Sequence, residues 1–284
     1  MQIGLNLSTS AAAGADPVAD AVDAERLGFD FVSVTDHLHG THPTFETWTL
    51  LCYVGAATER VRLVTNVLGL PYRAPTVTAK MAESLDRLSG GRFVLGLGAG
   101  GADVEFDGFG VAIRTPGEKV DALIEALDVI RGLWREQAYT FGGDHYRAWQ
   151  AQLEPKPDRP IPIWLGAYGP RMLEVVGRFA DGWLPSMPFA GPDVIPAMMQ
   201  DVLYAASESG RDPSRITKAY NVPVRVGKPT KRPGIVAGEP DVVVDQLRWL
   251  GDELGFDALN IWPVGEEAEQ RQRFAEEVLP HLRD

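Results

Sequence analysis

Short apolar runs alternate with longer amphipathic segments along the whole chain. Several of these runs are so rich in Val, Ile, Leu and Phe that they read as strands buried on both faces. The eight predicted strands are Ile3–Leu7, Phe31–Thr35, Val61–Leu68, Phe93–Gly98, Ile161–Gly166, Gly182–Pro185, Thr217–Val226 and Ala258–Pro263. The seventh is the weakest, because Pro223 has no N–H to donate within a sheet. Strands separated by helical segments indicate a parallel α/β fold, and eight of them favour a closed (β/α)8 TIM barrel over an open sheet.

Helix boundaries are clearest in two segments. Asp16 suits an N-cap, Pro17 fits the first helical position, and Gly28 ends the same helix. In Lys119–Arg135 the apolar residues fall on one helical stripe, as in a helix packed against a sheet. A glycine stop followed by Phe and a strand occurs at 27–30 and again at 254–257, which supports repeated β/α units. Residues 1–284 are therefore predicted to form a single barrel domain.

Two segments interrupt the alternation. Residues 103–118 form a polar, Gly-rich excursion after the fourth strand. Tyr139–Pro162 contains a predicted hairpin around Gly142-Gly143, followed by a connector stiffened by prolines. We therefore expect a TIM barrel with insertions in its βα loops.

The composition narrows the range of partners. A formal net charge of −12 argues against binding to nucleic acid or to an anionic membrane, both of which need a basic surface. No apolar run approaches the roughly 20 residues of a membrane span, and the first residues do not resemble a signal peptide. The single cysteine, Cys52, cannot form an internal disulfide. These features predict a cytoplasmic protein, in which an anionic ligand would be attracted only by local donors.

In a parallel barrel the site forms from residues that directly follow the strands, and four such clusters stand out. The first is Thr35-Asp36-His37, after the second strand. A histidine there could transfer a proton near neutral pH, although a capping Asp beside a surface His is an equal interpretation. Neighbouring strand residues point to opposite sides, so Asp36 would orient His37 only if the chain turns.

The second and third clusters follow the next two strands. Asn66, in Thr65-Asn66-Val67, needs hydrogen-bond partners in an apolar strand, which a ligand, a bulge or backbone groups could supply. The glycines of residues 96–101 permit close approach of a ligand, but they also suit an ordinary strand-end turn.

The fourth cluster, Gly166–Arg171, joins a small-residue loop to a helix that starts at Pro170. Free N–H groups at a helix start, with Arg171 as a charged donor, favour a phosphate site over a plain βα turn. No metal site is predicted, because His37, His39 and His42 lack companion ligands. The chain also lacks a G-x-S-x-G elbow and a Walker loop.

As a set, these motifs resemble the bacterial luciferase-like flavin oxidoreductase superfamily, and within it the F420 (deazaflavin)-dependent branch. The resemblance covers nearly the whole chain. The segments that carry it are Gly28–Asp30, Thr35–His37, Ala57–Leu63, Leu85–Arg92, Gly96–Gly100, Pro162–Ala167 and Ala180–Trp183.

The resemblance implies an oxidoreductase that transfers a hydride between coenzyme F420 and a small organic substrate. It implies that His37 is the proton donor or acceptor, with Asp36 in support, and that residues 103–118 close over the substrate. The ring would lie against Asn66 and Val67, joined by a cis peptide bond. The other implied cofactor contacts are Gly98, Ala99, Gly100, Gly166, Ala167, Tyr168, Gly169 and Arg171.

One position departs from the pattern. In the sugar-phosphate dehydrogenase of this branch, a carboxylate follows the glycines of the fourth strand. Gly101 stands at that place here, with Asp103 and Glu105 only nearby, which leaves the acidic partner of His37 open.

Three alternatives remain at this point. The nearest is a two-component monooxygenase of the same family that uses reduced FMN. The others are a non-catalytic flavin-binding relative and a phosphate-binding lyase or isomerase barrel without a redox coenzyme. The oligomeric state is open; a homodimer that pairs through barrel helices such as Ala74–Leu88 is one possibility to test.

Overall fold

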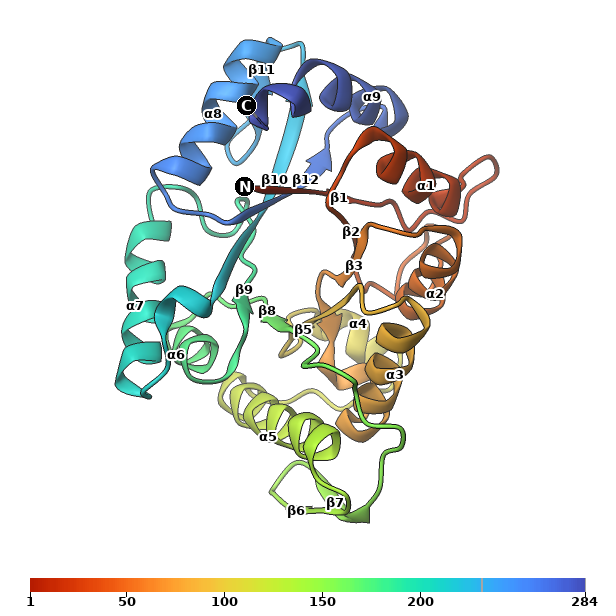
Figure 1. Cartoon of the computed structure of the whole chain (residues 1–284), viewed down its shortest axis with the longest axis vertical. Helices are drawn as coiled ribbons and strands as arrows, with labels where there is room; N and C mark the ends of the chain where they lie inside the picture. The colour runs from red at the N-terminus through yellow and green to blue at the C-terminus, as the bar shows by residue number, and fades with distance from the viewer. Residues whose placement is uncertain (231, 284) are drawn as a thin grey trace.

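The strands of the computed structural model form one closed parallel barrel inside a layer of helices (Figure 1). The structure describes residues 1–230 and 232–283. In ring order the barrel strands are β1 (Gln2–Asn6), β2 (Phe31–Val34), β3 (Arg62–Thr65), β5 (Phe93–Gly98), β8 (Ile163–Leu165), β9 (Gly182–Trp183), β10 (Thr217–Val226) and β12 (Ala258–Pro263). Pairing of β12 with β1 and of β9 with β10 closes the ring. The predicted TIM barrel is confirmed.

The barrel helices cover the outside of the strands (Figure 1). They are α1 (Pro17–Leu27), α2 (Thr47–Ala57), α3 (Pro75–Leu88), α5 (Pro116–Arg135), α6 (Pro170–Phe179), α7 (Ile195–Glu208), α8 (Pro240–Asp252) and α9 (Glu267–Glu277). The short helix α4 (Asp103–Gly108) lies in the loop after β5, and short 3-10 helices are η1 (Leu70–Tyr72), η2 (Pro213–Arg215) and η3 (Leu279–Leu282). Asp16 caps α1 through a 3.0 Å hydrogen bond from the Ala19 amide, and Gly28 ends it at φ +95°, as predicted. None of these helices combines the length and apolarity needed to cross a membrane, within the described part of the chain.

The two predicted excursions differ in outcome. The hairpin is confirmed as β6 (Tyr139–Gly142) and β7 (Arg147–Ala151), outside the barrel. The segment 103–118 is more ordered than predicted, because it contains α4 and the first turn of α5. Thr115 and Glu118 form a capping box at the start of α5, a local signal that the sequence carries.

The third and seventh strands show how the barrel treats irregular residues. The predicted strand 61–68 is interrupted after Thr65, and its end pairs with β5 as β4 (Leu68–Gly69). Pro223 lies within β10, contrary to its poor fit to a ladder. The Asn221 amide donates to Pro185 O at 2.9 Å, on the side of β10 that faces β9. The nitrogen of Pro223, two residues later, faces the same side. Because β9 does not extend as far as the level of Pro223, no strand hydrogen bond is lost there. Beyond that point β10 pairs with β11 (Val236–Gly238) instead.

The barrel interior is built in layers from alternate strand residues. The lower layer is an apolar cluster that includes Phe31, Val64, Val94 and Trp164. Polar side chains occupy the next layer toward the carboxyl ends of the strands. The chain ends also meet: the Asp30 carboxylate accepts from the Ile3 amide at 2.7 Å and from the Arg283 guanidinium at 3.0 Å.

Candidate functional site

His37 and Glu105 face each other at the carboxyl ends of the strands. His37 follows β2, and Glu105 lies on α4, directly beyond β5. His37 Nδ1 and Glu105 Oε1 are 2.7 Å apart, with 63% of the His37 side chain exposed and 18% of that of Glu105. Glu105 is therefore the carboxylate that faces His37 in the structure. A carboxylate bonded to one ring nitrogen fixes the tautomer and leaves the other nitrogen free for chemistry.

Tyr72 completes this group. Its hydroxyl donates to Glu105 Oε2 at 3.3 Å. Burial, followed by the negative charge of Glu105, raises the pKa of Tyr72 to about 12. The hydroxyl therefore keeps its proton at physiological pH and acts as a donor toward the carboxylate.

Asp36 contacts a different set of residues. Its fully buried carboxylate accepts from the Gly69 amide at 2.8 Å and from both terminal nitrogens of Arg73, at 2.8 and 3.2 Å. Arg73 also pairs with Glu46 at the start of α2. Burial alone would lower the pKa of Arg73, but the bonds from Asp36 and Glu46 outweigh it and raise the pKa. Asp36 thus holds the η1 segment in place and does not orient His37.

A layer of amide and hydroxyl side chains, all buried except the half-buried Asn6, lies inside the barrel around Asn66. The members of this amide layer are Asn6, Ser33, Asn66, Ser186, Asn221 and Asn260. Asn66 Nδ2 donates to Asn221 Oδ1 at 2.9 Å and to Asn6 Oδ1 at 3.3 Å. Asn221 Nδ2 in turn donates to Asn66 Oδ1 at 3.1 Å. The hydrogen-bond partners of Asn66 are therefore neighbouring side chains, where the sequence suggested a ligand, a bulge or backbone groups.

Asn66 also carries the irregular backbone of the third strand. The Asn66–Val67 peptide bond is cis, as the family resemblance implies. The Val67 side chain then lies between two of the predicted glycine positions. A Cβ on Gly98 would be 2.7 Å from Val67 Cγ2, and one on Gly166 would be 3.3 Å away. These two glycines therefore make room for Val67, whatever else they contact.

Gly100 has a different reason to be glycine. It adopts φ +95°, and a Cβ there would lie 2.7 Å from Pro71 and 2.9 Å from Phe106. Gly100 thus turns the chain tightly after β5 and lets α4, with Glu105, pack against η1. Ala99, one residue earlier, is half-buried against the core.

The predicted phosphate end is the N-terminus of α6. Gly169 precedes the helix, and no side chain caps its first amides, so these N–H groups are open to an anion. Ala167 is buried, and its carbonyl accepts from Trp183 Nε1 at 3.0 Å. The Tyr168 hydroxyl accepts from the Ser186 amide at 3.1 Å. The guanidinium of Arg171 donates to Asp121 of α5 at 2.7 Å.

The sequence named Glu105 only as a residue near the acidic position, and it missed Tyr72 and the partners of Asn66. Asn6, Asn221 and Asn260 carry the same signal as Asn66, an amide within an apolar strand, and could have been grouped with it. Tyr72 carries no such signal. Among the described residues, no group of three His, Cys, Asp or Glu side chains is arranged to hold a metal ion.

The family model of luciferase-like monooxygenases matches residues 1–232. The chain belongs to this family. Its membership confirms the resemblance seen in the motifs, and relatives named for coenzyme F420 support the deazaflavin branch.

The curated relatives differ in how much of their length aligns with this chain. An F420-dependent glucose-6-phosphate dehydrogenase of Nakamurella multipartita is 36% identical over 69% of this chain and 58% of its own length. The corresponding enzyme of Beutenbergia cavernae is 29% identical over 100% of this chain and 98% of its own. A 5,10-methylenetetrahydromethanopterin reductase of Methanolobus tindarius is 31% identical over 78% and 68%. The chain thus spans somewhat more than half of some curated relatives and nearly all of another.

Solved structures agree on the fold. An F420-dependent secondary alcohol dehydrogenase, described in complex with an F420-acetone adduct, superposes with a TM-score of 0.90. It is 22% identical, and the match covers 100% of this chain and 99% of that one.

Proposed function

We propose that this chain is an F420-dependent oxidoreductase that transfers a hydride between the coenzyme and a small organic substrate. The observation that carries the proposal is the His37–Glu105 pair, 2.7 Å apart at the barrel mouth. A protein of this family needs a proton donor or acceptor beside the hydride-transfer position, and this pair provides one. The relatives named as F420-dependent dehydrogenases support the choice of coenzyme.

The residues at the mouth fit a phosphorylated ring cofactor. The uncapped N-terminus of α6 offers amides and a positive dipole end to a phosphate, which offsets the chain's net charge of −12 locally. Backbone groups of Gly166, Ala167, Tyr168 and Gly169 would line that end. Because its guanidinium is paired with Asp121, Arg171 would contribute its backbone N–H.

The ring would rest on the cis peptide of Asn66 and Val67, supported from below by the amide layer. Gly98, Ala99 and Gly100 would line the path between ring and phosphate. When bound, the deazaflavin ring supplies or accepts a hydride at one carbon.

The proton work would fall to His37. Its Nδ1 faces Glu105, so Nε2 would exchange the proton with the substrate oxygen. Glu105 stabilises the protonated imidazole, and Tyr72 holds Glu105 in place through its hydroxyl. Asp36 acts indirectly, because it holds Arg73 and the segment that carries Tyr72.

We also propose that the whole chain works as one domain with a small-molecule substrate. The first and last barrel strands are direct neighbours, since Gln2 to Leu5 pair with Ala258 to Ile261. Neither end can therefore be removed without opening the barrel. A homodimer through exposed helices such as α3 remains to be tested by light scattering.

A coenzyme titration tests the proposal. Purified protein is titrated with F420 and, separately, with reduced FMN. Binding is followed by the change in coenzyme fluorescence or absorbance. We expect saturable binding of F420 and much weaker binding of FMN. Tight binding of reduced FMN without F420 binding would replace the proposal with the monooxygenase alternative.

A second experiment tests the residues. His37→Ala and Glu105→Gln should leave F420 affinity near that of the parent but lower turnover by about two to four orders of magnitude. Reduction of F420 by a panel of secondary alcohols and sugar phosphates gives the readout. Unchanged turnover in both variants, with coenzyme still bound, would favour a non-catalytic flavin-binding role.

A further inference from the structure

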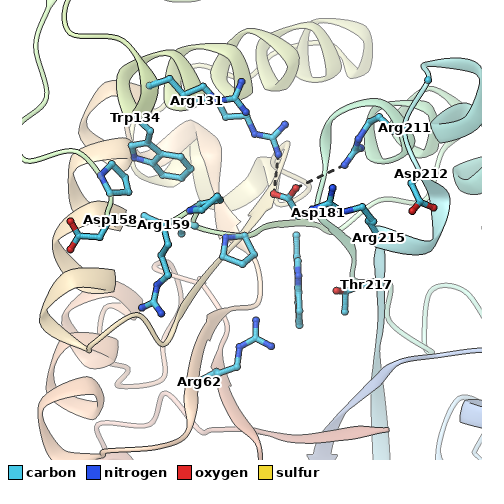
Figure 2. A pocket seen from close by; sticks show the side chains of 17 residues that line it. Arg62, Arg131, Trp134, Asp158, Arg159, Asp181, Arg211, Asp212, Arg215 and Thr217 are labelled. Carbon is cyan, nitrogen blue, oxygen red and sulfur yellow. Dashed lines mark hydrogen bonds and ion pairs between the residues drawn. The ribbon is translucent and has the colours of Figure 1, made fainter.

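The opposite end of the barrel holds a large pocket that the proposed reaction does not use. It opens where β3, β8, β9 and β10 begin, whereas His37 lies where the strands end. The cavity volume is about 970 Å³. Its walls come from the end of α5, the proline-rich connector 157–162 and the segment 210–217 (Figure 2).

Arginines dominate the lining of this pocket. The six are Arg62, Arg131, Arg135, Arg159, Arg211 and Arg215, against three aspartates, Asp158, Asp181 and Asp212. The formal charge of the lining is therefore +3, from six positive and three negative groups, in a chain of net charge −12. A concave basic region on an acidic protein focuses the field for an anion.

The three carboxylates are already engaged. Asp181 pairs with Arg131 at 2.9 Å and lies 3.9 Å from Arg211, as the dashed lines in Figure 2 mark. Asp158 pairs with Arg87, outside the pocket, at 2.9 Å. Asp212 accepts from the amide and hydroxyl of Ser214 at 3.0 and 2.7 Å.

Helix ends explain part of the arginine cluster. Arg211 donates to the carbonyls of Gly177 and Ala180 at the end of α6, both at 2.6 Å. Arg131 and Arg135 lie in the last turns of α5, where positive charge offsets the helix dipole. Arg62, Arg159 and Arg215 do not belong to the ends of α5 or α6.

These three arginines approach the pocket from different segments (Figure 2). Among the described residues, Arg62 and Arg215 have no carboxylate within 4.0 Å, and Arg159 has only Asp86, at 3.5 Å. Arg62 lies 5.6 Å from the centre of the Trp164 ring and donates to Gln2 Oε1 at 3.3 Å. Burial lowers the pKa of Arg62, and the negative charge of Asp30 offsets this effect only in part.

Glycines next to the pocket leave room for two of the side chains that line it. A Cβ on Gly91 would coincide with the Arg159 guanidinium, so this glycine makes the position of Arg159 possible. A Cβ on Gly182 would lie 2.3 Å from the Trp164 ring, which Arg62 covers. Two glycines thus accommodate two parts of the lining.

We propose that this pocket binds a small molecule that carries a di- or triphosphate chain. Guanidinium groups bind phosphate oxygens in pairs, and arginines on several sides match several phosphates better than a single carboxylate. The volume is that of a small-molecule site, for which about 300–1,000 Å³ is usual. The bound chain would bridge Arg62, Arg159 and Arg215.

Isothermal titration calorimetry at fixed ionic strength tests the proposal, with tripolyphosphate, ATP and citrate as probes. The variants are Arg159→Gln and Arg215→Gln, each with the same charge change as the control Arg147→Gln, an exposed residue of β7 outside the pocket. We expect tripolyphosphate to bind, with affinity reduced by about tenfold in each pocket variant and unchanged in the control. Urea denaturation confirms that each variant is folded.

The probes distinguish the source of the phosphate chain. Tighter binding of ATP than of tripolyphosphate supports the proposal and identifies a nucleotide, whereas equal binding supports a site for the phosphate chain alone. No binding of either phosphate compound, citrate binding as tightly, or an equal loss in Arg147→Gln would overturn the proposal. Because the pocket lies at the opposite end of the barrel, these outcomes are independent of F420 binding.

Discussion

Asn66 and Asn221 exchange two side-chain hydrogen bonds across the barrel interior, at 2.9 and 3.1 Å. One of these residues carries the cis peptide at the mouth, and the other lies on β10, next to Ser186 and Asn260. The pair therefore fixes the position of the Asn66 backbone along the barrel axis and its orientation. It also separates the apolar lower layer from the mouth.

Asn221→Ala should weaken both stability and coenzyme binding. The substitution removes a buried hydrogen-bond partner from each of Asn66, Ser186 and Asn260, so we expect the free energy of unfolding to fall by about 2–3 kcal/mol. F420 affinity should fall as Asn66 loses its support. Val64→Ala, in the apolar layer, is the control: it should lower stability without changing coenzyme affinity. Equal coenzyme affinity in both variants would contradict a positioning role for the amide layer.

Asp36→Asn should act on stability, with no change in proton transfer. The fully buried Asp36 carboxylate pairs with Arg73, and removing one charge of a buried pair costs about 3–5 kcal/mol. Urea denaturation measures the loss, which Asp36→Asn combined with Arg73→Met should partly restore. The pH profile of turnover should keep its shape. A displaced profile would instead place Asp36 in the proton path.

Gly98→Ala and Gly101→Ala form a matched pair. A Cβ at position 98 would lie 2.7 Å from Val67, whereas one at position 101 would meet nothing within 4 Å. We expect Gly98→Ala to cost about 1–3 kcal/mol of stability through overpacking and to weaken F420 binding by moving Val67. Gly101→Ala should leave both quantities close to the parent values. Fluorescence titration and urea denaturation of the two variants provide the comparison.

Glu25 should make stability depend on pH. Its carboxylate accepts from the amides of Glu59 at 3.0 Å and Val61 at 2.9 Å, as well as from Arg60. Burial would raise the pKa of Glu25, but these bonds outweigh it and hold the pKa below its ordinary value of 4.5. A lowered folded pKa means that the stabilisation is complete above 4.5 and is lost as pH falls through the folded value.

Glu25→Gln should therefore be less stable than the parent by about 1 kcal/mol at pH 7. The gap should narrow as the pH falls below 4.5. Denaturant titrations between neutral pH and the acid range give the curve. A gap that stays constant would show that the charge of Glu25 contributes nothing.

The sequence predicted the barrel well because its signals are local. Apolar runs, the Asp16 cap and the Gly28 stop each act within a few residues, and all appear in the structure. Glu105 was only placed near the acidic position, because α4 has six residues, too few for a helical periodicity to show. Its contact with His37 joins positions 68 residues apart, which only the closed fold brings together.

For Asp36 the sequence predicted the location but not the contact that the side chain makes. Its place after β2 predicted a role in the site, and the structure puts it near the site. The deciding contact is with Arg73, whose position depends on how η1 packs after the interrupted third strand.

The family motif at 85–92 is explained by packing. Arg92 donates to the carbonyls of Gly55 at 2.7 Å and Thr58 at 2.9 Å and so fastens α2 to β5.

Because both ends of the chain meet at Asp30, the chain could start at a different residue and still form the same barrel. Ile3 and Arg283 both bond to this carboxylate, so a short linker could join the two ends of this sequence. New termini in the β6–β7 turn, outside the barrel, would leave every barrel strand whole. Such a circular permutant should show the parent's circular dichroism and coenzyme affinity, because the barrel depends on which strands are neighbours and not on which is translated first.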